Sequence, residues 1–292
     1  MKQSRKLSFL FTIVVYALAL AVALFVYCRA PGSVLFRVFA ADIAATVFVY
    51  AVSLPLGNAS LYDPYWSVAP VVILPLCISA FGVWNAGTIA LLVCVGYWGI
   101  RLTANWAYTF RGYDHQDWRY TMLREKTGAF YPLVSLFGIM LFPTLVVYFC
   151  LLPALYYVQA GGVDLFTLLG FALCLSAATL QLIADIQLHR FQKQTADRGQ
   201  IIRSGVWRHA RHPNYLGEIL MWWGVFVVLL SVRPDLWLMG IGALCNTLMF
   251  LFISIPMAET RMAGYKEGFD RYVKETNKLL PVSFKNERAK EA

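Results

Sequence analysis

The densest group of residues with chemical potential is the stretch WRHARHPNYLGEILMWWG at 207–224, where Arg, His, Asn and Glu run directly into Leu, Met and Trp. Pro213 suits the first turn of a helix, because the N–H that proline lacks would have no partner there. From that start, Asn214, Glu218 and Trp222 share one helix face. Free N–H groups and the helix dipole favour an anion such as phosphate at this end, beside Arg208, Arg211, His212 and Tyr215. The alternative is a basic anchor at the membrane surface in which Glu218 pairs with an arginine.

A second polar group ends the otherwise apolar segment 164–192. Its members are separated by four, four and three residues, which places them on one face of a helix; they are Gln181, Asp185, His189 and Gln192. A carboxylate one or two turns inside a membrane boundary favours a water-filled cavity. The alternative is a stripe that contacts water or lipid headgroups at the helix end.

A third group lies in PMAETRMAGYKEGFDRYVKETNKLLP at 256–281, where Glu259, Arg261 and Tyr265 continue a helix out of the membrane. An amphipathic helix lying in the interface is the alternative. Together the three groups predict a basic, hydrogen-bonding cavity at the cytoplasmic mouth of the last four helices. The sequence contains no G-x-G-x-x-G or G-x-x-x-x-G-K-[ST], so a nucleotide here would be bound without a Rossmann or P-loop site.

Composition indicates the solvent in which these groups must work. Of the 292 residues, 59% are hydrophobic and 14% are charged, which is typical of a polytopic membrane protein. A span needs about 20 mainly apolar residues, and such runs cover 8–28, 34–56, 68–84, 86–108, 130–158, 164–186, 215–232 and 235–257. The runs lack the alternation of barrel strands. We therefore predict an all-α membrane helix bundle with seven or eight transmembrane helices, forming one domain.

The basic residues predict the orientation of these spans. Lys and Arg gather at the N-terminus, in 109–128, in 189–212 and in the C-terminal tail, whereas the alternate connections carry little positive charge. By the positive-inside rule the basic segments, and with them both termini, face the cytoplasm. The net charge of +9 is explained by this rule together with attraction to anionic lipid, and an anionic ligand on the cytoplasmic side would be compatible with it.

Cysteine and histidine spacing gives no sign of a metal site. The six cysteines lie singly and mostly inside apolar runs, and the four histidines form no H-E-x-x-H. Neither arrangement matches a zinc site. We expect no metal, and we expect no nucleic acid among the partners.

The run RHPNYLGE at 211–218, followed by WWG at 222–224, resembles the C-terminal signature of the steroid 5α-reductase family, including its bacterial members of formerly unknown function. Isoprenylcysteine carboxyl methyltransferases and sterol reductases share the RHPxYxG core. The signature therefore leaves both NADPH and S-adenosylmethionine open. The resemblance covers 165–283 and, more thinly, 60–125, and the first span looks like an extra element compared with the shorter animal enzymes.

The resemblance implies a set of NADPH contacts. The stretch ADIQLHRFQK at 184–193 is similar to the reductase segment that holds the nicotinamide and ribose. The segment RGYDHQDWRY at 111–120, with Arg111, is implied to close over the cofactor. Where this chain has Arg261, the family typically has His. The implied contacts are Gln181, Asp185, His189, Gln192, Arg208, Arg211, His212, Asn214, Tyr215, Glu218, Arg261 and Tyr265.

The resemblance also implies a catalytic pair. Asp63, in YDPYWSVAP at 62–70, aligns with the acidic residue that the reductases place beside the substrate carbonyl, and the family spacing leads on to Tyr97. The family has Glu at the first position, one methylene longer than Asp. Trp66 and Trp222 are the implied substrate-pocket residues. The alternative for Asp63 is an N-cap, followed by Pro64, for a helix that starts at residue 64.

The implied activity is NADPH-dependent reduction of a C=C bond conjugated to the carbonyl of a steroid-like 3-oxo-4-ene lipid. Tyr97 would stabilise the charge that develops on the carbonyl oxygen, and Asp63 would orient the phenol or, if burial keeps it protonated, donate directly. The hydrophobic substrate would enter from membrane lipid and the cofactor from the cytoplasm. The domain 1–292 would then comprise N-terminal helices (1–60), a substrate and catalytic part (61–128) and a cofactor-binding part (129–292).

Two other classes of function remain open. An S-adenosylmethionine-dependent methyltransferase acting on a lipid or an isoprenyl thiol would use the same C-terminal pocket but would not need Asp63 and Tyr97 as a pair. If the protein is instead a transporter or scaffold, substitutions of Asn214 or Glu218 would change its stability but would not affect any turnover. The bacterial members of the resembled family suggest a bacterial inner membrane, and the sequence leaves the oligomeric state open.

Overall fold

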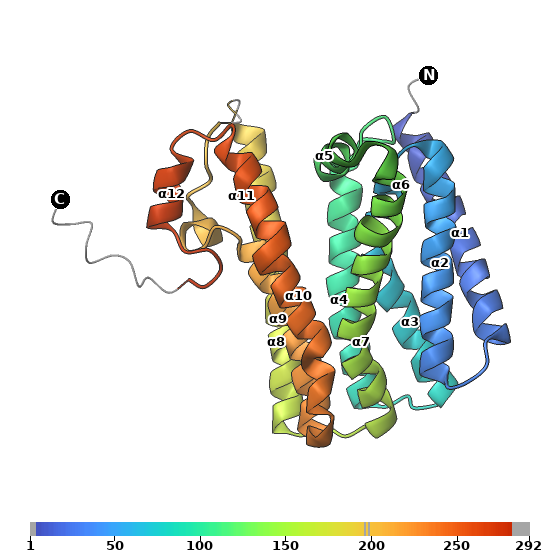
Figure 1. Ribbon diagram of the computed structural model, residues 1–292. Helices are drawn as coiled ribbons and strands as arrows, with labels where there is room; N and C mark the ends of the chain where they lie inside the picture. Colours follow the sequence, from blue (N-terminus) through green and yellow to red (C-terminus); the bar gives the residue numbers. More distant parts are fainter. Residues whose placement is uncertain (1–3, 196, 198, 282–292) are drawn as a thin grey trace. The chain divides into compact units, whose positions relative to one another are not determined.

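A computed structural model describes residues 4–195, 197 and 199–281 (Figure 1). Arg198 and the end of the basic tail, which contribute to the predicted orientation, lie outside the described residues. The described residues form helices and no strands, which confirms the all-α prediction. Within these described residues, eight helical runs are long and apolar enough to cross a membrane. The upper of the two predicted numbers of spans is therefore confirmed.

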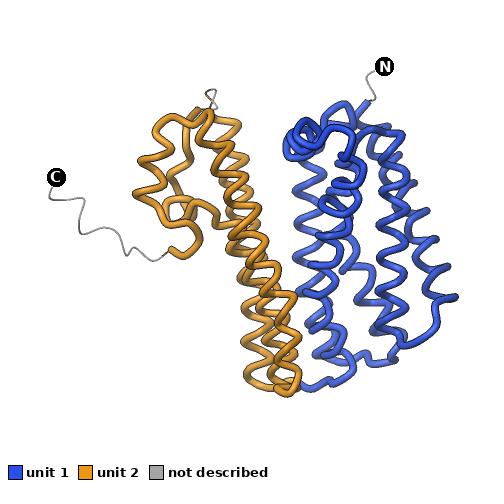
Figure 2. The backbone as a smooth tube through the Cα atoms, viewed as in Figure 1, with its two compact units in different colours: residues 1–162 blue, residues 163–292 orange. Residues whose placement is uncertain are grey.

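The chain divides into two compact units, residues 1–162 and 163–292 (Figure 2). The first contains α1 (Arg5–Arg29), α2 (Val34–Leu56), α3 (Tyr65–Phe81), α4 (Ala86–Thr109), α5 (Trp118–Thr127), α6 (Tyr131–Val134) and α7 (Phe142–Ala160). The second contains α8 (Leu165–Gln194), α9 (Pro213–Val232), α10 (Ile241–Met249), α11 (Ile255–Ala263) and α12 (Phe269–Glu275). The predicted single domain with three parts stays a prediction.

Local sequence explains where the long helices begin and end. Asn85 and Asp164 each form a capping box with the threonine three residues later, at the starts of α4 and α8. Gly57 and Gly82 end α2 and α3 in the left-handed conformation that glycine adopts without a steric cost. Each long span therefore has a defined end in addition to an apolar interior.

Two spans contain π-helical turns directly before a proline. The turn Ser135–Leu141 precedes α7, whose second residue is Pro143, and the turn Phe250–Ser254 precedes α11, whose second residue is Pro256. Proline cannot donate the usual i→i−4 hydrogen bond, and a wider turn accommodates the change in pairing. The fifth and eighth spans are therefore composite, covering Trp118–Ala160 and Pro234–Ala263.

The second unit is built on a very close contact between α8 and α9. A Cβ atom added at Gly217 would lie 2.5 Å from Cγ of Gln181, and one added at Gly224 would lie 2.6 Å from Sγ of Cys174. Gly170 meets Val228 in the same way, at 2.7 Å. Small residues at these positions let the two backbones touch, as in other membrane helix pairs.

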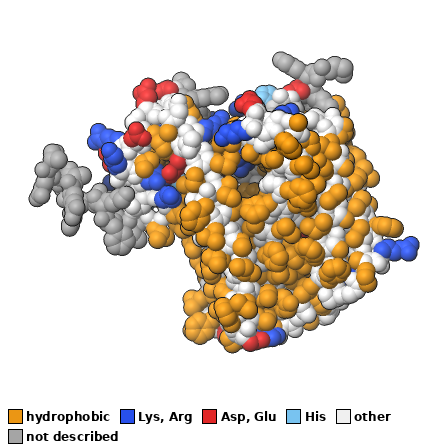
Figure 3. Space-filling model, viewed as in Figure 1, with side chains coloured by type: hydrophobic (Ala, Val, Ile, Leu, Met, Phe, Trp, Pro, Cys, Tyr) orange, Lys and Arg blue, Asp and Glu red, His pale blue; other side chains and the backbone are white. Residues whose placement is uncertain are grey.

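Much of the outer surface is apolar. Figure 3 shows hydrophobic side chains over most of the visible face, with charged side chains gathered mainly outside this band. Large apolar residues such as Ile13, Phe137 and Phe252 are exposed. A soluble monomer rarely shows so large a continuous apolar surface, so the surface is that of an integral membrane protein in contact with lipid.

Candidate functional site

The first unit holds Asp63 against a phenol that the sequence analysis did not single out. The Tyr120 hydroxyl donates a hydrogen bond to Oδ1 of Asp63, with 2.6 Å between the oxygens. Tyr120 is buried and Asp63 is half-buried, next to a buried cluster that includes Tyr62 and Tyr65. A hydrogen bond this short between a carboxyl and a phenol is one of the stronger kinds in proteins.

The segment before Tyr120 is fixed to the turn Ala59–Tyr62. The Asn58 amide donates to the carbonyl oxygens of Tyr113 and His115, at 2.8 and 3.1 Å, and the backbone N–H of Asp117 donates to Oγ of Ser60 at 3.0 Å. These bonds position the start of α5, and hence Tyr120, over Asp63. Segment 111–120, predicted to close over a cofactor, thus closes over the carboxyl of Asp63.

Tyr113 lies in this segment and contributes a buried hydroxyl. Its oxygen is 2.6 Å from Oγ1 of Thr12 on α1. Burial raises the pKa of Tyr113 to about 12, and the nearby Asp63 carboxylate adds to the effect. The phenol therefore stays neutral throughout the physiological pH range and ties α1 to the segment.

The structure contradicts the N-cap alternative for Asp63. Helix α3 begins at Tyr65, and Pro64 occupies its N-cap position without a side-chain hydrogen bond. Asp63 instead ends the short turn Ala59–Tyr62 in the right-handed helical conformation. Asp63 therefore lacks the extended backbone that is typical of an N-cap residue. Its side chain instead accepts a hydrogen bond from Tyr120.

The other residues implied for this unit lie on neighbouring elements. Tyr97 is half-buried on α4, next to the fully buried Trp98. Trp66 lies on α3, with its ring centroid 6.2 Å from that of Trp98. Arg111 is exposed. The pairing of Asp63 with Tyr97 stays a prediction, whereas the pairing of Asp63 with Tyr120 is observed.

The second unit buries polar side chains on two touching helices. Gln181 and Asp185 on α8 are buried one turn apart, and Glu218 on α9 is also buried. The indole N–H of Trp222 donates to Oε1 of Glu218 at 3.0 Å. Gly217 lies directly against Gln181. Polar groups inside a membrane bundle are costly, so this arrangement is a strong candidate for ligand binding.

The start of α9 agrees with the prediction from Pro213, which is its first residue. The basic side chains before it are engaged within the unit. Nε of Arg211 lies 2.8 Å from Oε1 of Glu259 on α11, and Nε2 of His212 lies 2.9 Å from the same oxygen. Arg211 also donates to the carbonyl oxygens of Val273 and Thr276. These contacts join the start of α9 to α11 and α12.

The remaining implied cofactor contacts differ in exposure. The rings of Tyr215 and His212 are stacked, with centroids 5.3 Å apart, and Oδ1 of Asn214 accepts from the Tyr215 backbone N–H at 3.1 Å. His189 is half-buried. The exposed members of the set are Gln192, Arg208, Arg261 and Tyr265.

The buried groups fit the hydrogen-bonding parts of a nucleotide. An amide such as that of Gln181 both donates and accepts, as a carboxamide partner would require, and carboxyl groups such as those of Asp185 and Glu218 would accept from ribose hydroxyls. Phosphate groups would match the guanidinium groups of Arg208 and Arg261, because both residues are exposed. Within the described residues, no group of three or more His, Cys, Asp or Glu is arranged to hold a metal ion.

Two functional candidates, Tyr120 and Asp42, were not identified from sequence, and Glu259 was identified without its partner Arg211. Tyr120 lies 57 positions from Asp63, and Glu259 lies 48 positions from Arg211, so spacing along the chain could not pair them. Asp42 did carry a signal, because it is a lone carboxylate inside the apolar run 34–56, where ionisable residues are functional candidates by default.

Comparison with known proteins identifies a family but no function. No curated protein and no solved structure matches the chain. A family model described as "Protein of unknown function (DUF1295)" matches residues 49–276. The match includes the buried polar residues of α8 and α9, the Asp63–Tyr120 pair and six of the eight helical runs found in the described residues, together with the end of α2. The protein is therefore a polytopic membrane member of the DUF1295 family.

Proposed function

We propose that this protein is a membrane-embedded reductase that uses NADPH to reduce a C=C bond conjugated to a carbonyl in a steroid-like lipid. The observation that carries the proposal is the hydrogen bond between Tyr120 and Asp63, 2.6 Å long and set against a tyrosine-rich core. A carboxyl group held in this way beside a buried tyrosine-rich cluster suits the orientation of a phenol that stabilises charge on a substrate oxygen. The resemblance of RHPNYLGE and ADIQLHRFQK to the steroid 5α-reductases supports the choice of reaction.

In the proposed reaction the chain stabilises the carbonyl oxygen and supplies a proton. Tyr97 donates a hydrogen bond to that oxygen, and Asp63 orients the donor. Tyr120 is a positioning residue, because it acts on the substrate through Asp63. When bound, NADPH would supply a hydride for the β-carbon of the enone. The Tyr97 phenol would relay a proton from water to the α-carbon, which gives the saturated ketone. The products are the ketone and NADP⁺.

The buried polar groups of the second unit hold the nucleotide in this proposal. Gln181 binds the carboxamide, and Asp185 and Glu218 bind ribose hydroxyls. The indole N–H of Trp222 donates to Oε1 of Glu218 and so orients its carboxyl group. The exposed Arg208 and Arg261 bind phosphate groups, including the 2′-phosphate that distinguishes NADPH from NADH.

The test is NADPH oxidation by detergent-purified protein given a 3-oxo-4-ene steroid, with mass spectrometry of the product. We expect a product heavier by two hydrogens and faster turnover with NADPH than with NADH. Tyr97→Phe should lose most of the rate. Tyr120→Phe should lose about tenfold in kcat and shift the pH profile, because it removes one hydrogen bond from Asp63. Tyr108→Phe, on the exposed part of α4, is the matched control.

Two results would overturn this assignment. If Tyr97→Phe and Tyr120→Phe both keep the wild-type rate, the tyrosines have no part in the reaction. If no enone in a steroid and lipid panel is reduced while S-adenosylmethionine binds saturably, the protein is a methyltransferase of the alternative kind.

A further inference from the structure

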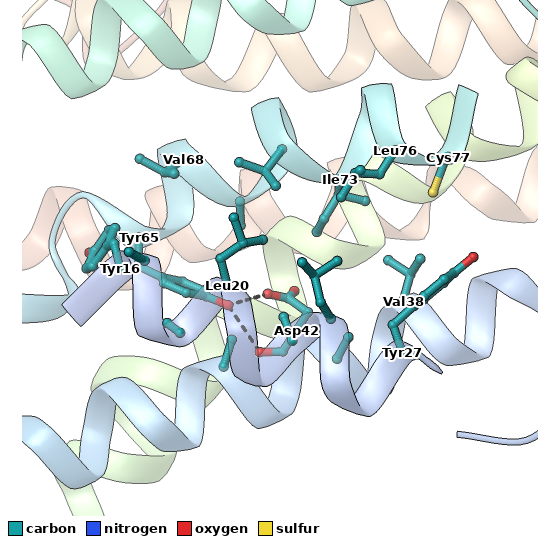
Figure 4. Close-up of a pocket in the computed structure, with 18 of the residues that line it drawn as sticks. Tyr16, Leu20, Tyr27, Val38, Asp42, Tyr65, Val68, Ile73, Leu76 and Cys77 are labelled. Atoms are coloured by element: carbon teal, nitrogen blue, oxygen red, sulfur yellow. Dashed lines mark hydrogen bonds between the residues drawn. The ribbon is translucent and has the colours of Figure 1, made fainter. Parts of the chain in front are cut away.

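The first unit encloses a cavity of about 400 Å³ between α1, α2 and α3 (Figure 4). Its walls are mostly apolar, with Leu20 and Leu24 from α1, Val38 from α2, and Ile73 and Leu76 from α3. Cavities of this volume are in the range that binds one small molecule. Its lining residues lie in three membrane-spanning helices, so the ligand would come from the lipid phase.

One carboxyl group interrupts the apolar wall. Asp42 lines the cavity and is itself 7% exposed. The Tyr65 hydroxyl donates to Oδ1 of Asp42 at 2.7 Å. Figure 4 shows Asp42 between the Tyr16 and Tyr65 end of the cavity and the Tyr27 end. A carboxyl group at this depth is costly unless all its hydrogen-bonding capacity is used, and the bond from Tyr65 uses one of its two oxygens.

The cavity is elongated and open at the side. Tyr16 and Tyr27 both line it from α1, and their separation of eleven positions corresponds to roughly 16 Å of helix. Leu20, Leu24 and Leu76 line the cavity while 41%, 42% and 48% exposed, respectively. Side chains that face both the cavity and the outside mark a lateral opening, through which an alkyl chain can enter from the bilayer.

We propose that this cavity binds an elongated lipid alcohol whose hydroxyl group pairs with Asp42. A hydroxyl both donates and accepts, so it satisfies the second carboxyl oxygen of Asp42 whether or not that carboxyl carries a proton. The aliphatic walls then cover the hydrocarbon chain. An alkane would leave Asp42 unsatisfied, and an anionic headgroup would meet the Asp42 carboxyl with no cationic side chain among the residues that line the cavity. This assignment does not depend on the proposed reductase activity.

The test is displacement of tritiated 1-dodecanol from the detergent-purified full-length protein. The competitors are unlabelled 1-dodecanol and n-dodecane, which share a chain and differ in the hydroxyl group. In the wild type we expect dodecanol to displace the label at roughly tenfold lower concentration than dodecane, the difference that one hydrogen bond to a carboxyl makes. Asp42→Leu should remove this preference while still admitting the chain.

Two further variants separate binding from folding. Ser67 is a buried polar residue on α3 that is not among the residues lining the cavity. Ser67→Ala should therefore keep the preference for the alcohol. Ala69→Phe places a ring into the cavity and should abolish binding of the labelled alcohol. Thermal unfolding of each variant checks that it is folded, and Ala69→Phe keeps the proposal testable if Asp42→Leu does not fold.

Three outcomes would overturn the proposal. Equal displacement by dodecanol and dodecane in the wild type would make the cavity a non-selective groove for acyl chains. A preference for the alcohol that survives Asp42→Leu would place the hydroxyl elsewhere. Unchanged binding in a folded Ala69→Phe variant would place the whole ligand elsewhere.

Discussion

Replacing Glu259 by Ala should loosen the join between the start of α9 and α12. In the folded protein, Oε1 of Glu259 accepts from both Arg211 and His212, and Arg211 is only 6% exposed. Removing one partner of a buried ion pair typically costs about 3–5 kcal/mol. Arg211 keeps its bonds to the carbonyl oxygens of Val273 and Thr276, and the Glu259 side chain is 18% exposed, so we expect about 2–3 kcal/mol.

Two backbone hydrogen bonds report on this join directly. The N–H of Arg211 donates to the carbonyl oxygen of Asn277 at 2.9 Å, and the N–H of His212 donates to that of Lys278 at 3.2 Å. If the join opens locally, a loss of 2–3 kcal/mol raises the open population roughly 30- to 150-fold. Hydrogen exchange measured by mass spectrometry on peptides that cover 207–214 should accelerate by that factor.

The control is Asp235→Ala, which removes an exposed ion pair with Arg233 in the same unit and should leave exchange at 207–214 unchanged. Glu259→Gln keeps an acceptor for Arg211 and should have an intermediate effect. The reasoning is refuted if Glu259→Ala leaves these amides as protected as in the wild type, or if Asp235→Ala accelerates their exchange equally.

Three other predictions follow from individual contacts. Gly224→Ala should destabilise the protein by about 1–3 kcal/mol in thermal unfolding, because its Cβ would lie 2.6 Å from Sγ of Cys174; Gly96→Ala, with nothing within 4 Å, should not. Burial raises the pKa of Tyr113 from 10.0 to about 12, so the neutral phenol stabilises the folded state below pH 10 and this stabilisation is lost as the pH rises to 12. In unfolding titrations between pH 10 and 12, the free energy of unfolding of the wild type should therefore fall by about 2 kcal/mol relative to Tyr113→Phe. Val163→Cys, in an exposed connection, should gain labelling by an impermeant thiol reagent from the non-cytoplasmic side, and labelling only from the cytoplasm would contradict the predicted orientation.

The membrane architecture could be predicted because run length and hydrophobicity are sufficient for it. The predicted run 34–56 coincides with α2, and 86–108 differs from α4 by one residue. The run 130–158 was too short because α5 and its following turn are polar or irregular, and hydropathy does not detect helices of that kind. Pro213 correctly marked the start of α9 because its missing N–H has no cost in a first turn.

The partners of the candidate site residues could not be predicted to the same degree. Helical spacing places Gln181 and Asp185 on one face, and both are buried. It gives no information on contacts between elements, such as Tyr120 with Asp63 or Glu259 with Arg211. Pairings of this kind depend on how a loop or a later helix folds back, which is decided by tertiary packing.

The glycine contacts between α8 and α9 also restrict how this protein can evolve. Where two backbones touch, a larger residue on α8 would need a smaller residue opposite it on α9. Gly217 and Gly224 have no side chain, so no smaller residue is available at these positions. Change is therefore confined to the outward faces of both helices, while Gln181 and Glu218 keep their spacing. Substitutions in the connections between helices can therefore accumulate without disturbing the helix pair that presents these buried groups.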